Sequence, residues 1–117
     1  MRRGELYWAT LEPRSGSEQR GERPVLLISD DTMNREPRWS SLIVVPISSS
    51  KTQAARSPTV VPINAGESGL TRDSVIVCHQ ITTLDRSKLG RLLGRLDETK
   101  LELVNRGLTV ALGLLGE

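Results

Sequence analysis

Short apolar stretches separated by turn residues fill the first half of the chain. Residues 6–11 predict a first strand, which ends at Glu12 and Pro13. Residues 24–29 are apolar on both alternating faces, so we expect a central strand that is covered on both sides. Residues 42–48 predict a third strand. Pro46 lies within that strand and indicates an edge or a bulge.

The pattern changes from strand to helix toward the C-terminus. Residues 59–63 and 74–81 predict two further strands, and Asp85 is suited to cap a short helical turn over residues 86–89. From Asp97 onward, apolar residues follow the helical repeat: Leu101, Val104, Leu108, Ala111, Leu112 and Leu115.

Three glycines bear on this predicted C-terminal helix. Gly107 lies inside it and weakens it by about 1 kcal/mol relative to alanine. Gly113 or Gly116 ends it. Several short strands followed by one helix predict a mainly β protein with a C-terminal α-helix packed on a small, strongly bent, barrel-like antiparallel sheet. The 117 residues fit a single domain, residues 1–117.

Composition adds three constraints. Only three residues are aromatic, so the core is aliphatic and small, and a symmetric partner would stabilise it. The formal net charge is +2, which does not by itself indicate a nucleic-acid partner. No apolar run is long enough to span a membrane, and the N-terminus lacks a signal-peptide pattern, so we expect a cytoplasmic protein.

The reactive side chains exclude several kinds of site. One cysteine and one histidine rule out an internal disulfide and the usual zinc clusters, and no glycine-rich phosphate loop occurs. Cys78 lies among alternating apolar residues and is expected to be an unreactive core residue. We therefore expect no metal and no cofactor.

Several segments together resemble the MazF/PemK/Kid family of bacterial toxin endoribonucleases, over nearly the whole chain. The most specific is Gly16-Ser17-Glu18-Gln19-Arg20-Gly21-Glu22-Arg23-Pro24-Val25. The others are individually weak: Gly4 to Trp8, Ser29-Asp30 with Asn34, Val45 to Ser48, Gly69-Leu70 with Asp73 to Val75, and Cys78 to Ile81 with Leu84-Asp85 to Leu89.

The resemblance implies a fold and an activity. The fold is an SH3-like barrel, which is also similar in architecture to the CcdB toxins, and the protein is a homodimer. The activity is metal-independent cleavage of single-stranded RNA, in which the ribose 2′-hydroxyl attacks its own phosphodiester to leave a 2′,3′-cyclic phosphate and a 5′-hydroxyl. A cognate antitoxin, whose flexible acidic segment covers the RNA groove, holds the toxin in check.

The resemblance also assigns catalytic residues. Arg23 matches the family's catalytic arginine, and its guanidinium is suited to hold two phosphate oxygens. Glu18 matches a catalytically important glutamate, which either accepts the 2′ proton or orients Arg23. Ser48 falls where many relatives have threonine and keeps the hydroxyl donor. His79 falls where relatives frequently have an acidic residue, and an acid, a base and an RNA-contacting role are all open to it, as is a structural one.

The loop over residues 12–22 and the strand ends carry the predicted RNA contacts. The RNA-binding residues are Arg14, Gln19, Arg20, Ser49 and Gln80. Thr82 replaces an arginine common in relatives and removes one candidate phosphate contact. Trp8 has apolar neighbours and is expected in the core, whereas Trp39 lies in a predicted loop and is open to base stacking or a partner contact.

Two alternatives remain at this stage. A gyrase-poisoning toxin of the CcdB type binds its target through a C-terminal end that contains tryptophan, whereas this chain ends Leu114-Leu115-Gly116-Glu117. An attenuated relative would keep RNA binding and lose cleavage, because Ser48, His79 and Thr82 all depart from the family pattern.

Overall fold

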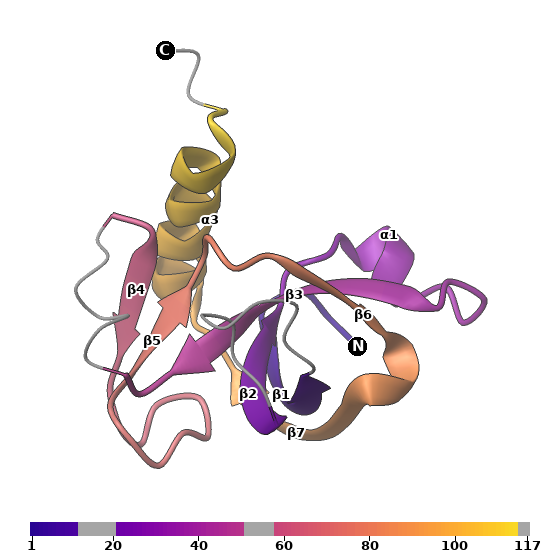
Figure 1. The fold of residues 1–117 in the computed structure, drawn as a ribbon, viewed down its shortest axis with the longest axis horizontal. Helices are drawn as coiled ribbons and strands as arrows, with labels where there is room; N and C mark the ends of the chain where they lie inside the picture. The colour runs from indigo at the N-terminus through magenta and orange to yellow at the C-terminus, as the bar shows by residue number, and fades with distance from the viewer. Residues whose placement is uncertain (12–20, 51–57, 115–117) are drawn as a thin grey trace.

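The computed structural model describes residues 1–11, 21–50 and 58–114, and in them seven strands form one antiparallel sheet (Figure 1). The strand order is β4-β5-β3-β2-β1-β7, and β6 pairs with β3. The strands are β1 (Glu5–Leu11), β2 (Gly21–Leu27), β3 (Ser41–Ser48), β4 (Val60–Ile63), β5 (Ser74–Val77), β6 (Thr82–Asp85) and β7 (Leu89–Arg95). The mainly β class is confirmed, and the sheet stays open rather than closing into a barrel.

In the described ranges, three helical segments accompany the sheet: α1 (Asp31–Asn34), the 3-10 turn η1 (Arg86–Lys88) and the C-terminal α3 (Glu98–Leu112). The predicted caps are confirmed. Asp97 accepts a hydrogen bond from the Lys100 amide at 2.7 Å, and Gly113 ends α3 with a φ of 69°. Asp85 caps η1 through the Ser87 amide. None of the helices in the described ranges is long and apolar enough to cross a membrane.

β2 is the central strand that its apolar pattern predicted. It pairs with β1 along one edge and with β3 along the other. Leu26 belongs to the buried cluster that also contains Val104 of α3, whereas Val25 and Leu27 belong to a second buried cluster on the opposite face of the strand. Aliphatic side chains therefore cover both faces of β2.

β3 pairs with three strands and so connects β5 and β6 to β2 in the same sheet. Its residues Ser41–Val44 pair with β6, and Ile47 and Ser48 pair with β5. Pro46 lies between these two ladders, where the interruption of pairing tolerates a residue without an N–H. The sequence predicted an edge or a bulge at Pro46, and the structure shows instead a change of partner strand along one side of an interior strand.

Some predicted boundaries were wrong. The strand expected over residues 74–81 ends at Val77, because residues 78–79 form a turn before β6 begins at Thr82. β2 begins at Gly21, so Pro24 is an interior residue of that strand, although pairing with β3 starts only at Val25. The sequence analysis did not predict β6, β7 or α1.

Two interruptions of register shape β7, the edge strand beside β1. Tyr7 pairs with Leu92 and Ala9 pairs with Leu89, so Gly90 and Arg91 of β7 together face the single residue Trp8. Two residues opposite one is the signature of a β-bulge, which bends the strand and redirects side chains.

The loop between β4 and β5 lies against β7. A β-carbon on Gly69 would overlap the Leu93 carbonyl, and one on Gly94 would overlap the Ser68 carbonyl. These two glycines therefore allow the two backbones to touch directly. Gly69 also has a φ of +83°, which favours glycine.

A buried polar network fixes the start of α1. The Ser29 hydroxyl donates to Asn34 Oδ1 at 2.6 Å, and Asn34 Nδ2 donates to the Ser29 carbonyl at 2.8 Å and to Asp31 Oδ1 at 3.1 Å. The Ile43 amide of β3 donates to the Ser29 hydroxyl. The polar residues Ser29 and Asn34 thus join the β2–α1 connection to β3.

Candidate functional site

Antiparallel pairing brings Arg23 and Ser48 to the same end of the β2–β3 ladder. The last pair of that ladder is Val25 with Pro46, and Arg23 and Ser48 each lie two residues beyond it. Side chains return to the same face of a strand every two residues. The strand register therefore brings these two residues together, although 25 positions separate them in the sequence.

Arg23 and Ser48 line one groove, which we call the main groove. Its volume is about 510 Å³, and its wall also includes Ser49 beside Ser48. Two further arginines, Arg72 and Arg91, lie in the same wall. Arginines suit this position because the planar guanidinium binds phosphate oxygens in pairs. The main groove is thus a cationic channel with hydroxyl groups at one side.

The Ser48 side chain is fixed in place. Ser48 is only 5% exposed, and its hydroxyl accepts a hydrogen bond from the Ser50 amide at 3.0 Å. A serine hydroxyl has one proton to donate as well as lone pairs to accept with. That proton is not donated to any group in the described part of the chain. The Ser48 hydroxyl is therefore held as a donor at the edge of the main groove.

His79 and Gln80 lie in a different place. Both follow β5, and neither lines the main groove of this chain. His79 Nδ1 lies 2.7 Å from the Thr59 hydroxyl, so its ring is oriented by the segment before β4. The Gln80 side-chain oxygen is buried and accepts no hydrogen bond from any described residue. Their predicted roles stay predictions.

Four predicted site residues fall outside the described ranges: Arg14, Glu18, Gln19 and Arg20. Their assignments also stay predictions. Cys78, by contrast, is fully buried, and burial raises the pKa of its thiol to about 11. The expectation of an unreactive core cysteine agrees with this placement. Within residues 1–11, 21–50 and 58–114, no three His, Cys, Asp or Glu side chains gather as metal ligands would.

Trp8 was misplaced from the sequence, and most other lining residues of the main groove had no predicted site role. Trp8 is 37% exposed and lines the main groove, so its prediction as a core residue was wrong. Strict alternation along β1 carries the correct signal, because Tyr7, Ala9 and Leu11 are buried while Trp8 and Thr10 are exposed. Lining residues that had no predicted site role include Glu22 and Gly69, which lie within the segments that resemble the family, and Arg72 and Arg91, which do not.

Comparison with known proteins gives consistent results across sequence and structure. Residues 2–112 match the model of the family described as PemK-like, MazF-like toxin of type II toxin-antitoxin system. Endoribonuclease MazF of Staphylococcus saprophyticus is 40% identical over 114 residues, which cover 97% of this chain and 92% of that protein. Endoribonuclease EndoA of Bacillus subtilis is 39% identical over 115 residues, which cover 98% of this chain and 97% of that protein.

Solved structures share the fold. MazF from Deinococcus radiodurans superimposes with a TM-score of 0.78 at 27% identity, covering 97% of this chain and 96% of that one. An endoribonuclease in complex with its cognate antitoxin, from a mycobacterial species, superimposes with a TM-score of 0.77 at 25% identity and the same coverage. The match extends along nearly the full length of each chain, so the whole fold is shared.

Proposed function

The chain belongs to the PemK-like, MazF-like toxin family of type II toxin-antitoxin systems, and from that premise we propose that it is an endoribonuclease that cleaves single-stranded RNA in the main groove. The observation that carries this proposal is the meeting of Arg23 and Ser48 at one end of the β2–β3 ladder, inside one cationic groove. The relatives that are named endoribonucleases favour this activity over gyrase poisoning.

The reaction requires few groups. The ribose 2′-oxygen attacks the neighbouring phosphorus, a new O2′–P bond forms, and the P–O5′ bond breaks. A base takes the 2′ proton, and an acid supplies a proton to the leaving 5′ oxygen. Arg23 neutralises the charge that develops on the phosphorane, and the Ser48 hydroxyl donates to one of its oxygens. Cleavage by this route leaves a 2′,3′-cyclic phosphate and a 5′-hydroxyl.

Two residues are candidates for the base. Glu18 follows from the family resemblance and lies outside the described ranges. His79 has an imidazole, a common general base, but it does not line the main groove of its own chain. The pH dependence of Glu18→Gln and His79→Gln variants separates them, because only the loss of the true base removes the acidic limb of the rate profile.

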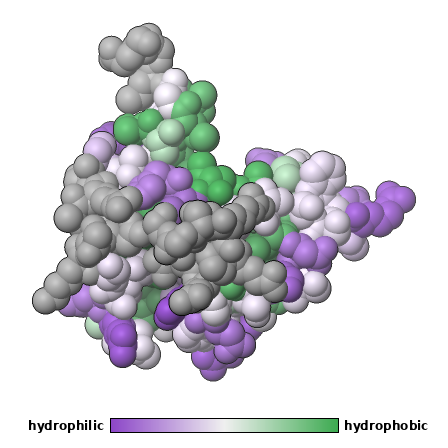
Figure 2. All heavy atoms as spheres, viewed as in Figure 1, coloured by the Kyte–Doolittle hydropathy of each residue, from purple (hydrophilic) through white to green (hydrophobic). Residues whose placement is uncertain are grey.

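Exposed apolar side chains on α3 support a homodimer. Leu103, Val110 and Leu112 are exposed on this helix, whose C-terminal end projects beyond the sheet (Figure 1). Figure 2 shows apolar side chains gathered along the same helix. A domain with only three aromatic residues gains stability by covering such a surface with a second copy. The Leu112→Glu variant should shift the mass measured by light scattering from dimer to monomer.

A protein antitoxin is the second partner that we propose. The related mycobacterial endoribonuclease is solved with its cognate antitoxin. The arginines Arg23, Arg72 and Arg91 in the main groove suit an acidic segment that competes with RNA for the same surface. We place the protein in the cytoplasm, where both RNA and such an antitoxin are found.

Cleavage is tested with purified protein and single-stranded RNA in EDTA. The matched control is the same RNA with 2′-deoxyribose at the cut position. We expect cleavage of the first RNA only, with cyclic-phosphate ends. Cleavage of the deoxy control would contradict 2′-hydroxyl attack. Binding without cleavage would identify an attenuated relative, and gyrase inhibition with intact RNA would identify a CcdB-type toxin.

A further inference from the structure

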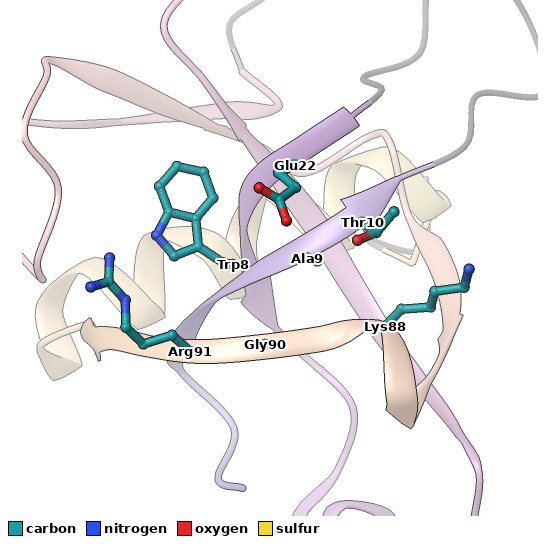
Figure 3. A pocket seen from close by; sticks show the side chains of 7 residues that line it. All are labelled: Trp8, Ala9, Thr10, Glu22, Lys88, Gly90 and Arg91. Atoms are coloured by element: carbon teal, nitrogen blue, oxygen red, sulfur yellow. The ribbon is translucent and has the colours of Figure 1, made fainter.

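A second cavity opens beside the main groove. We call it the side pocket; it has a volume of about 310 Å³ and is drawn in Figure 3. It adjoins the main groove, because Trp8, Glu22 and Arg91 line both. Its size lies at the lower end of the range for small-molecule sites, about 300–1,000 Å³. It therefore suits one nucleotide rather than a longer segment.

Three neighbouring strands and the turn η1 build the side pocket. Figure 3 shows Trp8 and Thr10 on β1 between Glu22 on β2 and two cations, Arg91 on β7 and Lys88 at the end of η1. Strand pairing places Trp8 opposite Pro24 and Thr10 opposite Glu22, so Trp8 and Glu22 are diagonal neighbours on one face of the sheet. An aromatic ring, a carboxylate and cations thus surround one small space.

The β-bulge in β7 lies at this pocket. Gly90 and Arg91 together face Trp8, and both residues line the cavity. Bulges are frequent beside active sites, where they redirect a side chain. Gly90 adds no side chain to the space in front of Trp8. The backbone irregularity therefore coincides with the opening of the pocket and with the placement of Arg91.

Two charged side chains of the side pocket, those of Glu22 and Arg91, are not used by the fold. Neither side chain makes a hydrogen bond or an ion pair with another residue of the described ranges. Trp8 keeps 37% of its surface exposed, in a protein that has only two tryptophans. An exposed indole beside a charged pair without internal partners is typical of a recognition site.

Resting on the endoribonuclease function proposed above, we propose that the side pocket binds one nucleotide that flanks the cleaved phosphodiester, and that it selects guanine. The base stacks on Trp8, as bases of single-stranded RNA stack on aromatic side chains. Arg91, which lines both cavities, binds the phosphate that joins this nucleotide to the main groove.

Glu22 supplies the selectivity. A carboxylate only accepts hydrogen bonds, and its two oxygens match two adjacent donors. Guanine presents two such donors, N1–H and the N2 amino group, on the base edge that unstacked RNA exposes. Adenine and cytosine pair a donor with an acceptor at that edge, and uracil places its one donor between two carbonyls. Guanine is therefore the best partner for Glu22.

The first test measures cleavage of a pool of short RNAs that are randomised on both sides of the cut. We expect the wild-type protein to prefer guanine at one flanking position. Trp8→Ala should lower kcat/KM about 5- to 150-fold on RNAs with guanine there. Glu22→Gln should remove the guanine preference and leave preferences at the other positions unchanged.

Matched controls come from the same chain. Trp39→Ala removes the other tryptophan, which is 48% exposed and lines neither cavity. Arg95→Ala removes an exposed arginine of β7 that lies outside both cavities and is the control for Arg91→Ala. We expect both controls to cleave at the wild-type rate with the wild-type preferences.

The second test measures contact between the base and the indole. In Trp39→Ala, Trp8 is the only tryptophan, so its fluorescence reports on the side pocket alone. The probe is the preferred RNA with 2′-deoxyribose at the cut position. We expect this RNA to quench the fluorescence, and the same RNA with an abasic nucleotide at the flanking position to bind with little quenching. The Trp8→Ala variant should bind the abasic RNA and the complete RNA with the same affinity.

Failure of this inference is distinguishable from failure of the proposed function. If the wild-type protein cleaves no RNA, the endoribonuclease proposal fails. If it cleaves, but Trp8→Ala and Glu22→Gln keep its rate and its preferences, the nucleotide pocket is overturned. Loss of antitoxin binding in those variants with unchanged cleavage would also overturn it, because the pocket would then hold a protein segment.

Discussion

A β-carbon on Gly107 of α3 would lie 2.9 Å from Cys78 Sγ and 3.2 Å from Cys78 Cβ. The helix thus approaches the turn after β5 more closely than any other residue type permits. On helix propensity alone, alanine at this position stabilises by about 1 kcal/mol. Contact with a fully buried side chain outweighs that gain, since overpacking a core costs about 1–3 kcal/mol.

We therefore expect Gly107→Ala to lower the free energy of unfolding, measured by urea denaturation. Cys78→Ala removes the sulfur atom that the new methyl group would meet. The double variant should lose less stability than the sum of the two single variants. Strict additivity would show that the contact between α3 and Cys78 is not what requires glycine here.

Cys78 provides a prediction about pH. Burial raises the pKa of its thiol from 9.0 to about 11, so folding favours the protonated form. The protonated Cys78 thiol therefore makes its full contribution to the stability of the fold below pH 9. This contribution is lost as the pH rises from 9 toward 11, because the unfolded chain releases the thiol proton more readily than the folded chain. Below pH 9, a thiol reagent should modify Cys78 only as fast as the protein opens.

The measurement is the rate of modification at pH 8 in increasing urea. A rate that follows the unfolded fraction supports a core cysteine. Full modification of the native protein within the mixing time would contradict the buried placement. Cys78→Ser, which lacks the thiol, sets the background of the assay.

Gly69 predicts a close contact between the β4–β5 loop and β7. Alanine at position 69 is destabilising for two reasons: the backbone has a positive φ, and the new β-carbon would overlap the Leu93 carbonyl. Gly66 is a matched control, because its φ is +89° and nothing lies within 4 Å of its β-carbon position. Gly66→Ala should cost about 1–2 kcal/mol, the left-handed penalty alone.

Gly69→Ala should lower the free energy of unfolding clearly more than Gly66→Ala in the same thermal unfolding assay. Because Gly69 lines the main groove, the Gly69→Ala substitution should also lower the rate of RNA cleavage. Equal stability of the two variants would mean that the loop moves away from β7 without a penalty.

The Ser29–Asn34 network predicts a stability effect far from the groove. Asn34→Ala removes the acceptor of the buried Ser29 hydroxyl proton and the side-chain donor to the Ser29 carbonyl, which costs about 1–3 kcal/mol. Asn64→Ala, at an exposed loop residue, should change the free energy of unfolding by less than about 0.5 kcal/mol. Equal urea midpoints for the two variants would rule out a structural role for this network.

Arg23 and Ser48 predict effects on cleavage without loss of the fold. Arg23 is exposed, so Arg23→Ala should keep the melting temperature and lower the single-turnover rate at least about 10²-fold. Arg23→Lys keeps the charge but not the planar fork and should restore only part of the rate. Wild-type cleavage by Arg23→Ala would contradict the mechanism.

Ser48 allows a finer comparison. Ser48→Ala removes the hydroxyl that accepts from the Ser50 amide and donates into the groove, so we expect slower cleavage. Ser48→Thr keeps the hydroxyl and adds a methyl group that strands accommodate well, so it should cleave at close to the wild-type rate. Single-turnover rates on one short RNA decide between these outcomes.

The sequence predicted the parts of the fold that local patterns encode. The apolar faces of β2, the Asp97 cap and the Gly113 terminus of α3 are each specified within a few residues. β7 was missed because its two register shifts break the alternation that identifies a strand. Trp8 was misplaced because its apolar neighbours were weighed above the two-residue period of β1.

The site was predictable only in part. Arg23 and Ser48 were identified by family resemblance, and the β2–β3 register explains why they meet. Arg72 and Arg91 had no local signal, because they reach the main groove through the β4–β5 loop and the bulge in β7. Such contributions depend on tertiary packing, which no short segment of sequence contains.

The shared strand β3 also determines how the enzyme can be divided. Residues 1–50 contain Arg23 and Ser48, whereas Arg72 and Arg91 belong to the remainder. Neither fragment holds a whole groove; without β3, β6 loses its partner strand and β5 keeps only β4. Two separately expressed pieces should therefore be harmless alone and toxic once they reassemble. The chain after residue 50 is thus a suitable place to divide the protein into a split, inducible nuclease.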